Sequence, residues 1–365
     1  MKLSLPKKDL ASLVSAVAPA AAKKASHAAL GCVKIVATDS GVAMTATDLF
    51  TGVSGRIAAD VSEDGALLVS SSDLMSAVRA LPDGETHITL DGNRLQLRVG
   101  KSKQRIAWSS VGDYPDLPQM DASKAVGISA STLLLAVGSV AHSVSTDDMR
   151  AHMCGVHVEI GGGRCRAMST NGSASSLRDV ECSVEGPTML VPGKSVAPLK
   201  QALDRAKDGV VNVASHDGYM FVEHGSVTMS MKLSGESFPV EPAKKVAEMA
   251  KSKAVNCATI SREMFLDEVT RVRSQDGEMP IAFTFRDGAV SMFAKCATGE
   301  AEGEVACDYS GKPVTVGFNA LHLAPALAAM TADDVTFSFG GALDPAVIKH
   351  ATNDECLMIV MTARL

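Results

Sequence analysis

The order of expected helices and strands repeats three times along this chain of 365 residues. Each copy has an amphipathic helix, several strands, a second helix that follows an apolar strand, and further strands. The first helices are expected near Asp9, Thr132 and Met264, and the second helices follow the strands that begin at Ala66, Thr188 and Pro313. The layout recurs about every 120 residues, which is too long for a solenoid unit and typical of a domain. The sequence therefore predicts three copies of one domain.

The composition agrees with three independent cores. Hydrophobic residues make up 46% of the chain and charged residues only 21%, so each third can bury a core of its own. Aromatic residues make up only 4%, and we expect cores of Ala, Val, Leu and Met. The net charge of −6 argues against an ordinary nucleic-acid-binding domain, but an average charge does not locate a basic strip.

The cysteines and the chain start indicate the compartment. The eight cysteines have irregular spacing and no C-x-x-C pair, which argues against a disulfide scaffold and a zinc ribbon. The start lacks an apolar signal stretch, and no apolar run approaches the roughly 20 residues that span a bilayer. We expect a soluble cytoplasmic protein with no metal and no cofactor.

Two connectors divide the repeats. Residues 114–124 contain two prolines and resist both helix and central strand, and residues 243–254 are rich in Lys and Ala and predict a helical connector. The expected domains are 1–122, 123–250 and 251–365. Each mixes two helices with antiparallel strands, an α+β arrangement in which helices cover one face of a sheet.

Short motifs in a fixed order resemble those of the bacterial DNA polymerase III beta subunit family, the sliding clamps. The motifs are the opening M-K-L-S-L, A-T-D-L at Ala46, D-Y-P-D-L at Asp113, V-P-G-K at Val191, Phe238-Pro239, G-F-N at Gly317 and the terminal M-T-A-R-L. The resemblance spans the whole chain and implies a dimeric ring of six domains, with helices on the inner face and antiparallel sheets outside.

The function that this resemblance implies is mechanical. A sliding clamp encircles duplex DNA without reading its sequence and tethers the DNA polymerase III catalytic subunit, the clamp loader and other proteins that carry a clamp-binding motif. It is a non-catalytic subunit. The alternatives are a diverged clamp paralogue or mobile-element clamp, a three-domain protein-binding scaffold that does not encircle DNA, and an unrecognised hydrolase.

A clamp that slides needs attraction to phosphates without contacts to base edges. In the helix after Val191, Val196, Leu199 and Leu203 predict the buried face, and Lys194, Gln201 and Arg205 lie opposite. Taken singly, each basic residue is more often an ordinary solvated charge. The resemblance favours a DNA-binding role for these residues only as a set. The candidates for DNA binding are Lys8, Lys23, Lys24, Arg79, Lys101, Lys103, Arg105, Arg150, Lys194, Arg205 and Arg271.

The resemblance also implies a groove for a partner peptide between the second and third domains. The matched residues are Met153, Thr170, Gly172, Leu177, Pro239, Asn319, His322, Val360, Met361 and Arg364. Without the family argument, Val360 and Met361 read equally well as the last core strand. The family's usual His-Arg pair is missing from the stretch 170–175, and the chain ends in Met-Thr-Ala-Arg-Leu rather than Met-Pro-Met-Arg-Leu. We therefore expect a wider or flatter groove and a different partner consensus.

The joint between two copies is expected at an edge strand of the first domain. Ile106 and Trp108 alternate on one strand, where the family has apolar interface residues, and are expected to face the region of Val272. Burial of Trp108 in the core of its own domain is an equally weighted alternative.

Enzyme signatures are weak in this sequence. Gly193-Lys194-Ser195 lacks the earlier glycine of a phosphate-binding loop, because position 188 is Thr188. His152, Cys154 and His157 do not have the spacing of known zinc sites, and a strand there would place His157 on the opposite face from the other two. No G-x-S-x-G motif is present.

Overall fold

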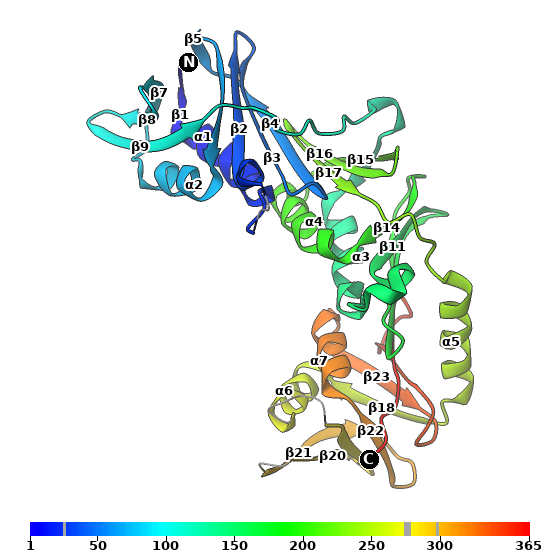
Figure 1. Cartoon of the computed structure of the whole chain (residues 1–365). Helices are drawn as coiled ribbons and strands as arrows, with labels where there is room; N and C mark the ends of the chain where they lie inside the picture. Colours follow the sequence, from blue (N-terminus) through cyan, green and yellow to red (C-terminus); the bar gives the residue numbers. More distant parts are fainter. Residues whose placement is uncertain (25–26, 274–278, 297–298) are drawn as a thin grey trace. The chain divides into compact units, whose positions relative to one another are not determined.

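The chain forms two compact units, each built around one long antiparallel sheet (Figure 1). The computed structural model describes residues 1–24, 27–273, 279–296 and 299–365. The first unit contains residues 1–130 and 197–233, and the second contains residues 131–196 and 234–365. Among the described residues, no helix is long and apolar enough to cross a membrane.

The first unit contains the first repeat together with the first strand and the last three strands of the second. Its helical elements are α1 (Lys7–Val17), η1 (Ala18–Ala20), η2 (Ala28–Gly31), α2 (Ser71–Ala80) and η3 (Ala122–Lys124). Its strands are β1 (Lys2–Pro6), β2 (Cys32–Thr38), β3 (Gly41–Thr47), β4 (Thr51–Ile57), β5 (Asp60–Glu63), β6 (Gly65–Ser70), β7 (Glu85–Asp91), β8 (Arg94–Val99), β9 (Ser102–Ser109), β10 (Val126–Ser129), β15 (Val210–His216), β16 (Tyr219–His224) and β17 (Val227–Lys232). The sheet order is β10-β15-β16-β17-β4-β3-β2-β6-β9-β8-β7-β1-β5.

The second unit contains the rest of the second repeat and the whole third repeat. Its helical elements are α3 (Ala130–Val140), η4 (Ala141–Ser143), η5 (Asp148–Met153), α5 (Val240–Lys253), α6 (Arg262–Val272) and α7 (Ala320–Ala329), and α4 (Gly193–Ala206) crosses the unit boundary. Its strands are β11 (Gly155–Gly161), β12 (Arg164–Thr170), β13 (Ala174–Glu181), β14 (Thr188–Pro192), β18 (Asn256–Ser261), β19 (Ile281–Arg286), β20 (Ala289–Cys296), β21 (Gly299–Asp308), β22 (Val314–Phe318), β23 (Asp334–Phe339), β24 (Ala346–His350) and β25 (Cys356–Val360). The sheet order is β14-β11-β12-β13-β25-β24-β23-β18-β21-β20-β19-β22.

Backbone pairing crosses the boundaries between repeats. The last strand of the second repeat, β17, pairs with β4 of the first, and Met229 lies opposite Val53. The last strand of the third repeat, β25, pairs in the same way with β13 of the second, and Met358 lies opposite Ser176. We call these pairings the first and second joints. Because each joint merges two repeats into one sheet, the two compact units do not follow the three repeats.

The repeated helices form as their apolar spacing predicts. Helix α1 buries Leu10, Leu13, Val14 and Val17, which recur at the interval of one helical face. It packs against α2 and β4, and α6 packs in the same way against α7 and β21. The expectation of helices on one face of antiparallel sheets is confirmed.

The core of the third repeat differs from the sequence-based expectation. It is rich in phenylalanine rather than built only from aliphatic residues. Phe337 lies at its centre with ring centroids 5.4–5.8 Å from those of Phe265, Phe285, Phe318 and Phe339. The low overall aromatic content was misleading because the phenylalanines concentrate in this one repeat.

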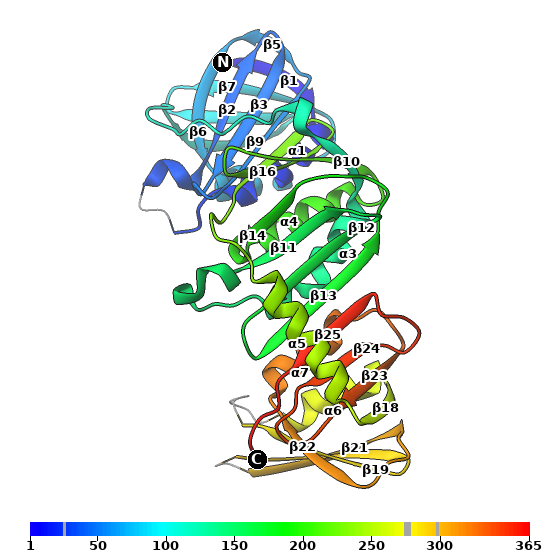
Figure 2. The ribbon, with the colours of Figure 1, turned by 90° about the vertical axis from the view of Figure 1, so that its right-hand side faces the viewer.

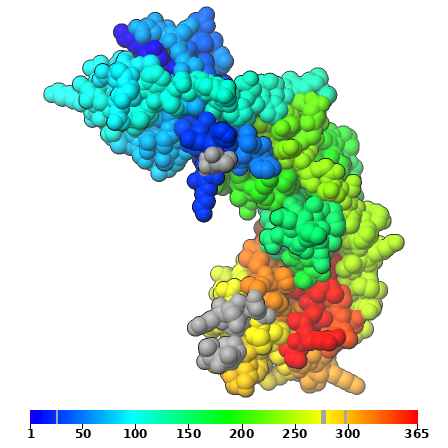
Figure 3. Space-filling model, viewed as in Figure 1, coloured from blue at the N-terminus to red at the C-terminus, as the bar shows by residue number. Residues whose placement is uncertain are grey.

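The predicted helical connector is α5. It lies across strands of the second sheet (Figure 2) and forms part of the surface of that unit, where its atoms are yellow-green in Figure 3. Val246, Ala247 and Ala250 of α5 pack against Val347 and Leu357 of the sheet.

Candidate functional site

The DNA-binding candidate of α2, Arg79, is exposed. Leu74, Ala77 and Val78 are buried against the sheet, while Arg79 points to solvent. The helix begins at Ser70, whose side chain accepts a hydrogen bond from the Asp73 amide at 3.4 Å, as an N-cap residue does. The exposed basic group of α2 therefore lies on a well-defined helix.

The other basic candidates of the first repeat are also exposed. Lys8 lies in the first turn of α1, and Lys23 and Lys24 follow η1 rather than continuing the helix. Lys101 lies in the turn between β8 and β9, and Lys103 lies on β9.

The two DNA-binding candidates on α4, Lys194 and Arg205, lie in different environments. Lys194 is exposed in the first turn. Arg205 is not free on the outer face, because its guanidinium donates hydrogen bonds to the backbone carbonyls of Ser15 and Ala16 at the end of α1. Arg205 therefore ties α4 to α1.

Two further candidates are already paired with carboxylates. Arg271 on α6 lies 2.7 Å from Glu268, and Arg150 in η5 lies 3.4 Å from Asp147. Helix α7 carries no basic residue except the half-buried His322. The third repeat therefore offers less net positive charge than the first.

One group of the predicted groove residues lies around the end of β25. Gly172 lies in the turn between β12 and β13, and the Met361 amide donates to the carbonyl of Ser173 in this turn at 2.9 Å. Thr362 bridges to Phe318, next to Asn319. The side chain of Asn319 caps α7 by accepting from the Leu321 amide, and Met361 is 38% exposed.

Four groove residues do not have the expected placement. Val360 is 0% exposed and belongs to the core. The alternative prediction of a core position is therefore confirmed for Val360, and the groove prediction for it is wrong. The hydroxyl of Thr170 is turned to the Ala174 carbonyl at 3.0 Å and holds the turn. Leu177 packs beneath α5 with Phe238, and Pro239 is the residue immediately before α5, so both lie at the connector helix.

Several polar residues at the second joint were missed by the sequence analysis. His142 of η4 contacts the Ser176 hydroxyl at 3.1 Å, and Ser143 contacts the same hydroxyl at 2.6 Å. Burial lowers the pKa of His142 to about 4, and the pKa of nearby His322 is also lowered by burial. No motif signals this cluster, because its members come from η4, β13 and α7.

Two strands present edges that are largely unpaired among the described residues. Strand β9 pairs with β8 over Ser102–Ala107 but with β6 only at Trp108 and Ser109. Strand β21 pairs with β20 over Gly299–Ala306 but with β18 only at Cys307 and Asp308. Each therefore leaves one row of backbone donors and acceptors open.

The residues predicted at the joint between copies lie in different environments. Ile106 is half-buried on the open stretch of β9. Trp108 is also half-buried, lies where β9 pairs with β6, and donates from Nε1 to the Gly92 carbonyl at 3.2 Å. Val272 is 1% exposed in the core of the third repeat, so its side chain offers no surface to a second copy and this part of the prediction is corrected.

The local structure around His152 also differs from the expectation. His152 lies in the short helix η5 and Cys154 precedes β11, so neither is on a strand as assumed. His157 stacks on Phe238 with ring centroids 5.4 Å apart. Within the described ranges, no group of three His, Cys, Asp or Glu side chains could hold a metal ion.

These features define a class of protein: three repeats of a two-helix, antiparallel-sheet domain that join edge to edge through their sheets. The sequence profiles of the DNA polymerase III beta subunit match the chain in the same order. The N-terminal domain profile matches residues 1–118, the central domain profile residues 127–240 and the C-terminal domain profile residues 251–364. The chain belongs to the DNA polymerase III beta subunit family, the sliding clamps.

Individual relatives cover the whole chain at low identity. The beta sliding clamps of Vibrio cholerae and Pseudomonas putida are 23% and 24% identical, each over 100% of both chains. Among solved structures, the Pseudomonas aeruginosa clamp with ligand has a TM-score of 0.88 at 22% identity, and the Bartonella birtlesii clamp bound to griselimycin has 0.89 at 23%, both over 100% of both chains. The fold is therefore that of sliding clamps.

Proposed function

We propose that this chain is a non-catalytic, cytoplasmic DNA sliding clamp that closes as a homodimer around duplex DNA. It would tether the DNA polymerase III catalytic subunit, the clamp loader and other proteins with a clamp-binding motif. Its domains would be residues 1–122, 123–250 and 251–365. The observation that carries this proposal is the match between the open edges of β9 and β21.

The repeat plan supports a pairing between these two edges. At both joints within the chain, the last strand of one repeat pairs with the fourth strand of the previous repeat. Strand β9 is the last strand of the first repeat, and β21 is the fourth strand of the third. Two copies that pair β9 of each with β21 of the other would use every such edge and close a ring.

The existing joints also predict the register of this pairing. At the first joint Met229, two residues beyond the Val227 that closes its hairpin, lies opposite Val53. Gln104 occupies the equivalent position in the β8–β9 hairpin, two residues beyond Ser102, which closes that hairpin. Ala301 in β21 is equivalent to Val53 in β4. Each lies opposite a buried alanine of the preceding strand, Ala294 for Ala301 and Ala46 for Val53. Gln104 would therefore lie opposite Ala301 of the second copy.

This register places opposite charges face to face. Counting outward along the antiparallel strands, Lys103 would oppose Glu302 and Arg105 would oppose Glu300. All four side chains are exposed within one copy. Opposite charges on directly facing residues contribute about 0.2–1 kcal/mol each. We therefore assign Lys103 to the ring joint rather than to DNA.

The remaining exposed basic residues support weak contact with DNA. We propose Lys8, Lys23, Lys24, Arg79, Lys101, Arg150 and Lys194 as phosphate contacts, with minor contributions from Arg205 and Arg271. Partner peptides would contact Met153, Gly172, Asn319, His322, Met361 and Arg364, where the small side chains of the 171–174 turn leave room.

Charge exchange at the joint tests ring closure. We expect Lys103→Glu with Arg105→Glu to give monomers in multi-angle light scattering, and likewise Glu300→Lys with Glu302→Lys. A mixture of the two double variants restores opposite charges at both joints and should recover dimers. If either double variant stays dimeric, or the mixture stays monomeric, this register is wrong.

Topological retention tests the function itself. The clamp would be loaded onto nicked plasmid DNA by its loader, separated from free protein, and the plasmid then cut once. A sliding ring remains on the circular plasmid and leaves the linear one. Equal retention on both forms would support a scaffold that does not encircle DNA.

A further inference from the structure

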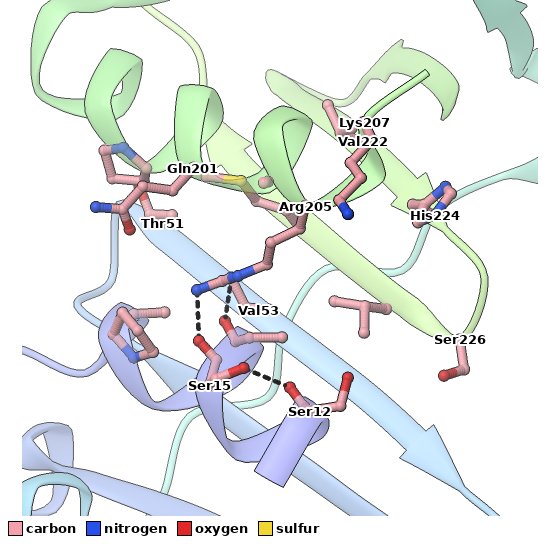
Figure 4. A pocket seen from close by; sticks show the side chains of 17 residues that line it. Ser12, Ser15, Thr51, Val53, Gln201, Arg205, Lys207, Val222, His224 and Ser226 are labelled. Carbon is pink, nitrogen blue, oxygen red and sulfur yellow. Dashed lines mark hydrogen bonds between the residues drawn. The ribbon is translucent and has the colours of Figure 1, made fainter. Parts of the chain in front are cut away.

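A cavity of about 550 Å³ lies between α1 and α4, above strands β4, β16 and β17 of the first unit (Figure 4). This volume is within the usual range of small-molecule sites. Its floor is apolar, with Val53, Val222 and Met229 each at most 8% exposed. Its polar side chains include those of Ser12, Gln201, Arg205, Lys207 and His224.

The charged groups of this cavity are all of one sign. None of its lining residues is Asp or Glu, and among the described residues neither Arg205 nor Lys207 forms an ion pair with a carboxylate. Carbonyl oxygens of Ser15 and Ala16 orient the Arg205 guanidinium but carry no net charge. The wall of the cavity therefore holds an oriented cation with no anion beside it.

The second joint has different side chains at the equivalent positions. The middle residue of the short helix after the first helix is Pro19 in η1 and His142 in η4. The strand residue at the joint is Val53 in β4 and Ser176 in β13. At the second joint, His142, Ser143 and Ser176 form a buried hydrogen-bonded cluster. The corresponding positions at the first joint hold Pro19, Ala20 and Val53, which line the open cavity.

We propose that the cavity at the first joint is a binding site for a small organic anion, with a carboxylate held by Arg205 and an apolar body on the floor of Val53, Val222 and Met229. Charge-assisted hydrogen bonds to a guanidinium are among the strong ones, and the apolar floor contributes burial. The ligand would bridge α1 and α4 and stiffen the first joint. This assignment does not depend on ring closure or on DNA.

Isothermal titration calorimetry of the full chain with 2-naphthoate and its neutral counterpart 2-naphthamide tests this site. We expect saturable one-to-one binding of the carboxylate, and binding of the amide about tenfold or more weaker, because the amide cannot make the charged contact. Arg205→Met should bring the carboxylate down to the affinity of the amide and leave the amide unchanged.

Two substitutions on α4 locate the site without touching Arg205. Ala202 lines the cavity, and Ala202→Phe should fill it and abolish binding of both compounds. Ala197 is exposed on the same helix outside the cavity, and Ala197→Phe should bind as the unmodified chain does. Three results would each overturn the proposal: no saturable binding of the carboxylate, equal affinity for the carboxylate and the amide, or binding that persists in Ala202→Phe.

Discussion

Acidification should weaken the second unit through His142. Burial lowers the pKa of this imidazole from its ordinary 6.5 to about 4. Between these values the unfolded chain binds more protons than the folded chain, so the free energy of unfolding decreases as the pH falls through this window. The stabilisation is fully present above pH 6.5. The whole shift corresponds to about 3 kcal/mol, and about 2 kcal/mol would be lost by pH 5.

A comparison with His142→Asn isolates this contribution. Asparagine does not titrate and can still hydrogen-bond to Ser176, and every other histidine of the chain is retained in the variant. Urea unfolding followed by far-UV circular dichroism at several pH values between 7 and 4.5 gives the two stability curves. Relative to the unmodified chain, the free energy of unfolding of the variant should rise by about 2 kcal/mol between pH 7 and pH 5. Parallel curves would show that His142 is not held neutral by burial.

Three further outcomes are expected from the fold and the proposed surfaces. Phe337→Ala should lower the free energy of unfolding by about 3–5 kcal/mol, because it empties the centre of an aromatic core, while Phe293→Ala at an exposed position should change it little; denaturant titration checks both. Trp108→Asp should convert dimers to monomers in light scattering, and an unchanged mass would remove Trp108 from the ring joint. Arg79→Ser with Lys194→Ser should weaken duplex binding equally for unrelated sequences and reduce its dependence on salt, as loss of phosphate contacts does; a sequence-dependent loss in fluorescence anisotropy would contradict this.

The repeated helices and most strands could be predicted because each buries one face. The spacing of Leu10, Leu13, Val14 and Val17 records the buried face of α1 directly, and the same holds for the second helices. The aromatic core of the third repeat could not be predicted from composition, because an average over the chain hides six phenylalanines that gather in one repeat.

The candidate groove was less predictable because burial depends on what covers each strand face. Val360 and Met361 are neighbours in sequence, yet one is in the core and the other is exposed. Leu177 lies under α5, and the sequence predicts that helix but not which strands it covers. Arg205 shows the same limit for charge: helical periodicity places it opposite the buried face, but only the neighbouring α1 carbonyls explain where its guanidinium points.

Backbone edges explain why a joint between repeats leaves so little trace in the side-chain pattern. Strand pairing is made by main-chain groups, so β17 and β25 join their partners through different side chains: Met229 opposite Val53 at one joint, and Met358 opposite Ser176 at the other. Such a joint constrains side chains only where they lie directly opposite each other. An open edge by itself can pair with any strand. When the two edges belong to separate chains, the fit of directly opposed side chains therefore also excludes wrong partners. In the proposed pairing of β9 with β21, the facing lysine, arginine and glutamates would select one partner and one register. The two joints within the chain need no such charges, because the covalent chain already brings their strands together.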